Sequence, residues 1–337
     1  MTQSTPYVVV LRKNTEGLST EAYADVLAER LPEYEVAHAQ TPAQERSLIE
    51  HARVATGVTL DETLLDDAEN LRMFVAASSG CNHLPVRQME ERGVILANAA
   101  GIHAPGIAEQ ALGYCLTFAR RLHEGLRRKE RDEWRHYKAS ELTGSTVTVV
   151  GLGAIGTAFV RRLDGMDVHS IGVRYTPEKG GPTDEVIGFD DDEFHEALSR
   201  TDYLVLSTPL SDTTRHLVGE AEFHTLPPSA YVVNVSRGAV VDTDALLAAI
   251  QKEDISGAAM DVTDPEPLPS DHPLWKMGNV LITPHMGGHT PEHWNRLADI
   301  VETNVERLEA GHTDGFENQV NDPVQPATTV LSPRDED

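Results

Sequence analysis

Three polar residues that could carry out proton and carboxylate chemistry each follow an apolar run typical of a buried strand. Arg237 follows YVVNVS, His285 follows NVLITP, and Glu266 lies shortly after GAAMDV. An arginine can hold a carboxylate or polarise a carbonyl, a histidine can exchange a proton near neutral pH, and a glutamate can orient that histidine. Because ligands of open parallel sheets bind outside the carboxyl ends of the strands, the three side chains are candidates for one active site.

A second stretch has the spacing of a dinucleotide-binding loop. The sequence VVGLGAIG places Gly151, Gly153 and Gly156 in the pattern G-x-G-x-x-G, after an apolar strand and before a helical run. The first glycine allows the tight turn, the second lets a pyrophosphate approach the main chain, and the third lets helix and strand pack closely. N–H groups at the start of the helix would then bind the diphosphate.

The end of the next strand bears on the choice of coenzyme. A carboxylate there would bind the ribose hydroxyls of NAD and repel the 2′-phosphate of NADP. This strand instead ends in Val173, Arg174 and Tyr175, and no carboxylate follows until Glu178. A guanidinium can grip a phosphate with two hydrogen bonds, and Tyr175 could donate its hydroxyl or stack on adenine. We therefore predict NADP(H) as the preferred cofactor and leave use of NAD(H) open; a solvated surface arginine is the alternative.

Short apolar runs alternate with helical patterns along the whole chain, which predicts βαβ units and mostly parallel sheets. The expected strands are residues 7–12, 71–78 and 93–99 in a first unit, and 146–150, 167–173, 203–208, 231–236, 257–262 and 279–284 in a second. The spacing of apolar residues predicts one long helix over 107–134, which would connect the domains and could pack on a second subunit. A further helix is expected over about 299–310.

Composition limits the classes of partner. The 337 residues fit two domains, and 54 acidic against 28 basic residues argue against nucleic acid or anionic membranes as partners. No run approaches the roughly 18 apolar residues of a membrane span, the N-terminus lacks a signal-peptide pattern, and two cysteines are too few for a disulfide framework. We therefore expect a cytoplasmic protein.

Three histidines raise the question of a metal site. His285, His289 and His293 recur every four residues, as zinc ligands on one helix could. Gly287 and Gly288 interrupt any helix there, however, so no metal site is predicted.

Six motifs, in order along the chain, resemble those of the D-isomer-specific 2-hydroxyacid dehydrogenase family. They are VVGLGAIG, STPLSDTTRHLV, NVSRGAVVD, DVTDPEPLP, HPLW and NVLITPHMGG, and the resemblance runs from about residue 80 to residue 311. It implies an α/β fold with two Rossmann-like domains and doubly wound parallel sheets. The implied dinucleotide-binding domain, 102–285, is inserted in a catalytic, substrate-binding domain formed by 1–101 and 286–337.

The resemblance also implies roles for individual residues. Arg237 would clamp the substrate carboxylate and carbonyl, His285 would be the general acid/base, and Glu266 would be its partner. In the loop SSGCNHLP, the N–H groups of Ser79 and Gly80 would bind the substrate carboxylate, although Asn82 stands where the family often has aspartate. The remaining implied contacts are Ala154 and Ile155 at the pyrophosphate, Thr208, Pro209 and Thr214 around adenine and ribose, and Val235 and Asp261 near the nicotinamide.

The resulting functional hypothesis is reduction of a 2-oxoacid to a D-2-hydroxyacid by hydride transfer from NAD(P)H. The D configuration and a homodimeric state follow from the resemblance, and Ile102 hints at an apolar substrate pocket. The ranking of glyoxylate, hydroxypyruvate, pyruvate and longer 2-oxoacids stays open. The alternatives are a non-catalytic nucleotide-sensing corepressor on the same fold, or a phosphoglycerate, formate or phosphite dehydrogenase.

The charge of −26 with only six lysines generates a prediction about salt. This balance resembles that of halophilic proteins, in which molar salt shortens the Debye length to roughly 3 Å and screens self-repulsion; an acidic protein of ordinary salt tolerance is the alternative. We expect the protein to unfold or lose activity at low ionic strength, and circular dichroism from dilute buffer to molar KCl checks this. Full stability in dilute buffer would remove the halophilic interpretation.

Overall fold

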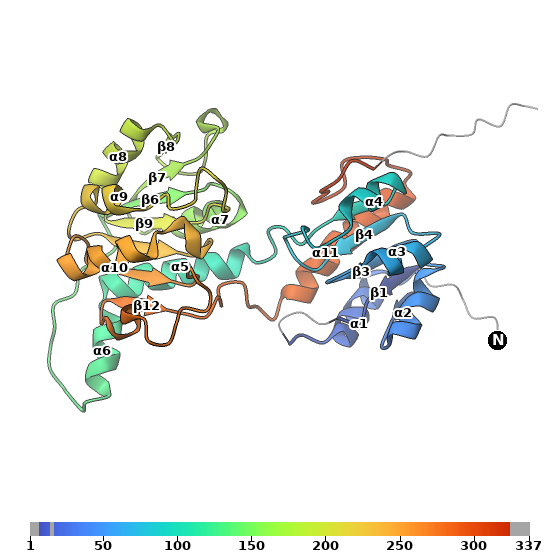
Figure 1. Ribbon diagram of the computed structural model, residues 1–337, viewed down its shortest axis with the longest axis horizontal. Helices are drawn as coiled ribbons and strands as arrows, with labels where there is room; N and C mark the ends of the chain where they lie inside the picture. Colours follow the sequence, from blue (N-terminus) through green and yellow to red (C-terminus); the bar gives the residue numbers. More distant parts are fainter. Residues whose placement is uncertain (1–6, 14–16, 324–337) are drawn as a thin grey trace, which may run out of the picture. The chain divides into compact units, whose positions relative to one another are not determined.

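The computed structural model describes residues 7–13 and 17–323 of the chain. The chain divides into two compact units, drawn in Figure 1. Unit 1 combines Met1–Ile102 with Pro291–Asp337, and unit 2 is the continuous segment His103–Thr290. Unit 2 is therefore an insertion in the sequence of unit 1.

Unit 1 is built on a five-stranded parallel sheet with the order β2-β1-β3-β4-β5, one of the two common doubly wound orders. Its strands are β1 (Val8–Val10), β2 (Val36–His38), β3 (Val54–Gly57), β4 (Met73–Ala76) and β5 (Ile95–Ala97). Its helices are α1 (Thr20–Arg30), α2 (Pro42–Ile49), α3 (Glu62–Asp67), α4 (Val86–Glu91) and α11 (His293–Glu309).

Both faces of this sheet are covered, as the alternation along β1 shows. Val8 and Val10 pack in one cluster with Trp294 of α11, whereas Val9 packs in the cluster on the other face with Ile49 of α2. Successive strand residues point to opposite faces, so a strand that is apolar at every position requires helices on both sides. The return of the chain through α11 therefore completes one of the two cores of unit 1.

Unit 2 contains a seven-stranded parallel sheet with the order β12-β11-β10-β9-β6-β7-β8. Its strands are β6 (Thr146–Val150), β7 (His169–Val173), β8 (Glu185–Ile187), β9 (Tyr203–Leu206), β10 (Tyr231–Asn234), β11 (Gly257–Met260) and β12 (Val280–Ile282). Its α-helices are α5 (Ala104–Ala119), α6 (Leu122–Lys129), α7 (Ala154–Arg162), α8 (Asp191–Ser199), α9 (Glu220–Thr225) and α10 (Thr243–Lys252). Three 3₁₀ turns complete it: η1 (Pro177–Lys179), η2 (Gly238–Val240) and η3 (Pro273–Lys276).

The strand order of unit 2 places a topological switch point at β6. The chain runs outward from β6 through β7 and β8 on one side, and through β9 to β12 on the other. This is the Rossmann arrangement, in which ligands bind at the carboxyl ends of the strands where the order reverses. The α/β fold with two doubly wound parallel sheets is confirmed, as are all six strands expected in this part of the chain.

The register of the sheet aligns the carboxyl ends of its strands. Val150 pairs with Val173 and with Leu206, and the row continues through Asn234, Met260 and Ile282. The residues that follow these six positions therefore lie along one edge of unit 2. They are Gly151, Arg174, Ser207, Val235, Asp261 and Thr283.

The expectation of a single long helix over 107–134 is wrong. Helix α5 ends at Ala119, Arg121 adopts a left-handed conformation with φ +50°, and α6 is a separate helix that ends at Lys129. The apolar stripe is buried only as far as Ala119, whereas Leu122 and Leu126 are 50% and 62% exposed. Without a core to pack on, the spacing of apolar residues does not keep the helix continuous.

Other differences from the expected elements are smaller. Strands β2, β3 and β8 were not predicted, and α11 begins at His293, ahead of the predicted helix at 299. Within the described residues, no helix is long and apolar enough to span a membrane.

Candidate active site in unit 2

The loop after β6 has the geometry that its glycines predict. Gly151 has φ +97°, and a Cβ there would lie 2.8 Å from the Thr208 nitrogen. A Cβ on Gly156 would lie 2.0 Å from the Gly151 oxygen. Ser207 fixes the turn from the neighbouring strand end, because its hydroxyl donates to the same Gly151 oxygen at 2.8 Å. Neighbouring main-chain atoms therefore leave no room for a side chain at Gly151 or Gly156.

Gly153 differs from its neighbours because open space surrounds it. No atom lies within 4 Å of a Cβ built there, and both Gly153 and Ala154 are exposed. Gly153 is also the N-cap of α7 and has no side chain to satisfy the first N–H groups of the helix, whereas Asp242 caps α10 through two such bonds. An open approach to unsatisfied N–H groups fits a diphosphate, so this loop fits the pyrophosphate of a dinucleotide. Ile155, in the first turn of α7, is half-buried.

Arg174 and Tyr175 follow β7, at the next strand end from the glycine loop. The half-buried Arg174 donates from Nη1 to the Gly180 carbonyl at 2.6 Å. This uses one of the five N–H donors of the guanidinium and ties the side chain to its own loop. Tyr175 is 58% exposed, its ring centroid lies 4.8 Å from that of Phe189, and its hydroxyl lies 3.3 Å from the Ser211 hydroxyl.

The predicted contacts on the other side of β6 lie in the loop after β9 and at the end of β10. Thr208 and Thr214 are buried, and Pro209 is exposed. The Thr214 hydroxyl donates to the Pro209 carbonyl at 2.7 Å and accepts from the Ser211 N–H at 2.8 Å. Thr214 therefore shapes this loop from inside. Val235 is 5% exposed and directly follows β10.

His285 and Glu266 are brought together as the sequence predicts. The His285 Nδ1 lies 2.7 Å from Glu266 Oε1, and both side chains are about half exposed, at 48% and 45%. They line one pocket of about 330 Å³, to which Leu268 and Trp275 contribute apolar surface. Because the carboxylate accepts a hydrogen bond from the Nδ1–H group, it sets the orientation of the ring and leaves Nε2 for a ligand.

The backbone of His285 is strained. Its φ of +54° is left-handed, which is uncommon for a residue other than glycine. The His285 N–H donates to the Asp261 carbonyl at 2.8 Å and helps to hold this conformation. Strain of this kind is maintained only where surrounding contacts determine the local structure.

The exposed side chain of Arg237 sits on a rigid turn. Arg237 Nη1 donates to the Ser236 carbonyl at 2.7 Å. The buried Asn234 side chain donates to the Arg237 carbonyl at 3.0 Å and accepts from the Ser236 N–H at 3.0 Å. Arg237 makes no hydrogen bond or ion pair with Glu266 or His285 in the described part of the chain.

Close packing joins the Arg237 turn to the segment that carries Glu266. A Cβ on Gly238 would lie 2.0 Å from main-chain atoms of Thr263, so the two segments are in direct contact. The Thr243 hydroxyl donates to the Asp264 carbonyl at 2.8 Å and adds a second link. The turn and the Glu266 segment are therefore positioned by one another.

Asp261, expected near the nicotinamide, has a carboxylate that is occupied by the protein. It is 3% exposed and accepts from the N–H groups of Met286 at 2.9 Å and Gly287 at 2.8 Å. It also accepts from Gln110 Nε2 at 2.9 Å and from the Thr283 hydroxyl. This buried carboxylate fastens the loop that carries His285.

Gln110, Tyr114 and Thr283 were not identified from the sequence. Gln110 Nε2 lies 2.6 Å from the Tyr114 hydroxyl, which also contacts the Thr283 hydroxyl. The available signal was the pair of polar side chains, Gln110 and Tyr114, four residues apart on one face of a mostly apolar helix. Their partner, Asp261, is distant in sequence, so the signal gives no reason to connect them.

The predicted carboxylate-binding residues Ser79 and Gly80 lie in unit 1, in the exposed loop after β4. The Ser79 carbonyl accepts a hydrogen bond from Asn98 Nδ2 at 2.7 Å, and the Gly80 carbonyl accepts one from the Ser78 hydroxyl at 2.9 Å. Both of these hydrogen bonds use carbonyls of the loop as acceptors. Over residues 7–13 and 17–323, no cluster of three or more His, Cys, Asp or Glu side chains could hold a metal ion.

The sequence of unit 2 matches a known family. The family described as D-isomer specific 2-hydroxyacid dehydrogenase, NAD binding domain, matches residues 112–287, which is more than half of the chain. The chain belongs to this family. The region matched contains the glycine loop, Arg237, Glu266 and His285.

Individual relatives agree with the family assignment. A glyoxylate reductase of Thermofilum pendens is 33% identical over 253 residues, which cover 73% of this chain and 74% of that protein. A D-3-phosphoglycerate dehydrogenase of Methanocaldococcus jannaschii is 32% identical over 306 residues, which cover 89% of this chain and 57% of that protein. The chain therefore belongs to a family of oxidoreductases and contains the NAD-binding domain of that family.

Solved structures of the family share the fold. A probable 2-hydroxyacid dehydrogenase from Rhizobium etli CFN 42, in complex with NADP, HEPES and L(+)-tartaric acid, is 25% identical with a TM-score of 0.73 and covers 95% of this chain and 99% of its own. A family member from Aeromonas salmonicida is 24% identical with a TM-score of 0.77 and covers 94% of this chain and 99% of its own.

Proposed function

We propose that this family member reduces a small 2-oxoacid to a D-2-hydroxyacid with a nicotinamide coenzyme. The observation that carries the proposal is the 2.7 Å contact between His285 Nδ1 and Glu266 on the edge of unit 2 that also holds the open glycine loop. A proton donor and a fitting cofactor loop on one sheet edge are what such a reduction requires. The D configuration rests on family membership.

The mechanism assigns one task to each side chain. Arg237 holds the substrate carboxylate and polarises the keto oxygen. When bound, the reduced nicotinamide supplies the hydride that adds to the keto carbon. His285 then donates the Nε2 proton to the keto oxygen, so that one hydride and one proton convert the 2-oxoacid to the 2-hydroxyacid. Glu266 stabilises the protonated imidazole through Nδ1.

The proton-transfer role predicts a large effect at His285. His285→Ala is expected to lower kcat for 2-oxoacid reduction by about 10²- to 10⁴-fold, with coenzyme affinity retained, because general acid catalysis is lost. Glu266→Gln is expected to cause a smaller loss, since the ring keeps a partner but loses the charge. Absorbance of the reduced coenzyme follows turnover, with glyoxylate as the first substrate and hydroxypyruvate, pyruvate and longer 2-oxoacids beside it.

A matched control is available in the same unit. His216 also has a left-handed backbone, with φ +50°, a carboxylate of Asp242 at 3.7 Å and a side chain that is 50% exposed. His216→Ala should leave kcat nearly unchanged. Near-normal turnover of His285→Ala would show that the assignment is wrong.

We further propose NADP(H) as the preferred coenzyme. Arg174 is the cation that follows β7, the strand next to the glycine loop, and four of its N–H donors remain for a phosphate. The 25% identical relative from Rhizobium etli has NADP bound, which supports this choice. The difference in affinity between NADP(H) and NAD(H) would arise from the contact of Arg174 with the 2′-phosphate alone.

The coenzyme proposal predicts a switch at Arg174. Arg174→Asp is expected to raise KM for NADPH by about 10- to 100-fold, because a charge-assisted hydrogen bond to the phosphate is lost and repulsion is added. KM for NADH should change little or fall. Arg161→Asp, the same charge change at an exposed position at the end of α7, should affect the two coenzymes equally. An unchanged KM for NADPH in Arg174→Asp contradicts the proposal.

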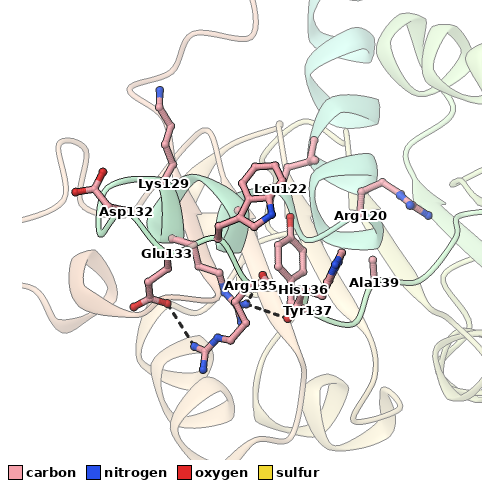
Figure 2. Close-up of a pocket in the computed structure, with 12 residues that line it drawn as sticks. Arg120, Leu122, Lys129, Asp132, Glu133, Arg135, His136, Tyr137 and Ala139 are labelled. Atoms are coloured by element: carbon pink, nitrogen blue, oxygen red, sulfur yellow. Dashed lines mark hydrogen bonds and ion pairs between the residues drawn. The ribbon is translucent and has the colours of Figure 1, made fainter.

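We also propose a homodimer in which α6 and the following segment dock on a second copy. Residues 120–138 carry eight basic and four acidic side chains in a chain of charge −26, so this segment is complementary to the remainder of another copy. A pocket of about 780 Å³ is lined by α6 and by the residues that follow it, from Asp132 to Ala139. Figure 2 shows Leu122 and Tyr137 among its lining side chains. Trp134, which also lines it, is 100% exposed, and a large aromatic side chain of this kind is typical of an interface anchor.

The docking segment predicts the effect of removing its aromatic anchor. Trp134→Ala is expected to weaken dimerisation by at least about 30-fold, the loss of roughly 2 kcal/mol typical of an anchor residue. Sedimentation velocity in molar salt measures it. Val320→Ala, which trims a side chain that is 44% exposed in unit 1, serves as the control. A dimer that is unaffected by Trp134→Ala, or a monomeric wild type, excludes this interface.

The non-catalytic alternative remains testable by the same assays. The relationship to D-3-phosphoglycerate dehydrogenase makes the phosphorylated 2-oxoacid a member of the panel. Coenzyme binding without turnover on any 2-oxoacid would favour a nucleotide-sensing role instead.

A further inference from the structure

A ring of hydrogen bonds links helix α5 to the loop that carries His285. Gln110 Nε2 lies within hydrogen-bond distance of Asp261 Oδ1 (2.9 Å), the Tyr114 hydroxyl (2.6 Å) and the Thr283 hydroxyl (3.1 Å). The Tyr114 and Thr283 hydroxyls are also in contact, and Thr283 donates to Asp261. All members of the ring belong to unit 2.

The direction of these bonds follows from the number of protons. The Thr283 hydroxyl has one proton and donates it to Asp261, so it accepts from Tyr114. Tyr114 must therefore stay protonated, and burial raises the pKa of its hydroxyl, although the hydrogen bond with Thr283 opposes this effect. A protonated Tyr114 at neutral pH is consistent with its place as a donor.

The ring supports the segment directly after His285. The same Asp261 carboxylate accepts from the N–H groups of Met286 and Gly287. His285 itself has φ +54° and would relax if those two anchors moved. The orientation of the imidazole therefore depends on where the Asp261 carboxylate is held.

Close packing leaves the loop little freedom to adjust. A Cβ on Gly287 would lie 2.9 Å from Asp261 Oδ2 and 3.3 Å from Ile107 Cγ1 of α5. A Cβ on Gly106 would lie 3.1 Å from the Gly287 oxygen. The start of α5 and the loop after His285 are thus in direct contact, so a change in the ring on α5 is transmitted to the loop.

We propose that Gln110 and Tyr114 are positioning residues for the reaction, which hold the Asp261 carboxylate and through it the His285 imidazole. The proposal rests on the proposed function, because it needs His285 as the proton donor. Neither residue touches the reacting atoms. Gln110 donates to the buried Asp261 carboxylate alongside the Met286 N–H, the Gly287 N–H and the Thr283 hydroxyl, and Tyr114 orients the Thr283 hydroxyl toward that carboxylate.

Two substitutions test this role. Gln110→Met keeps the approximate length of the side chain and removes its donors, and Tyr114→Phe removes only the hydroxyl. Each is expected to lower kcat by roughly 10- to 100-fold, because small displacements of a catalytic group have effects of this size. KM for the 2-oxoacid and Kd for the coenzyme, from the fluorescence of bound reduced coenzyme, should stay within about threefold of the wild type.

Tyr203→Phe is the matched control. Tyr203 is a tyrosine of unit 2, 4% exposed and stacked on Tyr231 in the same core cluster as Tyr114, and its hydroxyl makes none of the hydrogen bonds of the ring. Its kcat should match that of the wild type, and its change in Tm gives the purely structural cost of removing a buried hydroxyl. The proposal would be overturned if Tyr114→Phe lowered Tm more than Tyr203→Phe does and its loss of kcat were no larger than this extra loss of stability explains.

A double-mutant cycle separates this inference from the proposed function. If Gln110 acts through His285, Gln110→Met combined with His285→Ala should be no slower than His285→Ala alone. Additive losses would mean that Gln110 acts elsewhere. An inactive His285→Ala beside a fully active Gln110→Met overturns only the positioning role, whereas a fully active His285→Ala overturns the proposed function.

Discussion

The register of the parallel sheet in unit 2 is the constraint on which the candidate site depends. Val150, Val173, Leu206, Asn234, Met260 and Ile282 form one row, so the residue after each is placed on the same edge. Side chains that are far apart in sequence become neighbours without any loop having to reach across the sheet. A shift of one residue in a strand pair would turn that strand over and move the residue that follows it away from the site: a shift of β6 would displace the glycine loop, and a shift of β12 would displace His285.

The parts of the site that the sequence predicts are those whose chemistry is local. A side chain at Gly156 is excluded by the Gly151 oxygen of the same strand–turn–helix unit, and Gly151 needs a positive φ for the turn itself, so the spacing of the glycines identifies them without knowledge of the neighbouring strands. His285 and Glu266 were found because each follows a strand. The bond between Gln110 and Asp261 joins residues 151 positions apart, and nothing in the local pattern pairs them.

The elements that were missed have a similar explanation. Strands β2 and β8 are edge strands whose residues are only partly buried, and β3 contains Thr56 and Gly57, so none of the three shows the continuous apolar run by which the other strands were predicted. The break between α5 and α6 is set by where burial stops, since Leu126 continues the apolar spacing into solvent. Periodicity predicts which face of a helix is apolar, but the length of the core that meets that face is a property of the tertiary structure.

The return of the chain to unit 1 has a consequence for synthesis on the ribosome. The β5 edge of the first sheet is completed by Asn321, which accepts a hydrogen bond from the Leu96 N–H and donates to the Val94 carbonyl, and one core is completed by Trp294. These contacts span more than 200 residues, so the N-terminal segment emerges with an open sheet edge and an uncovered apolar face. Unit 2 can finish folding first, and the early segment then depends on solubilising charge or chaperones during that interval.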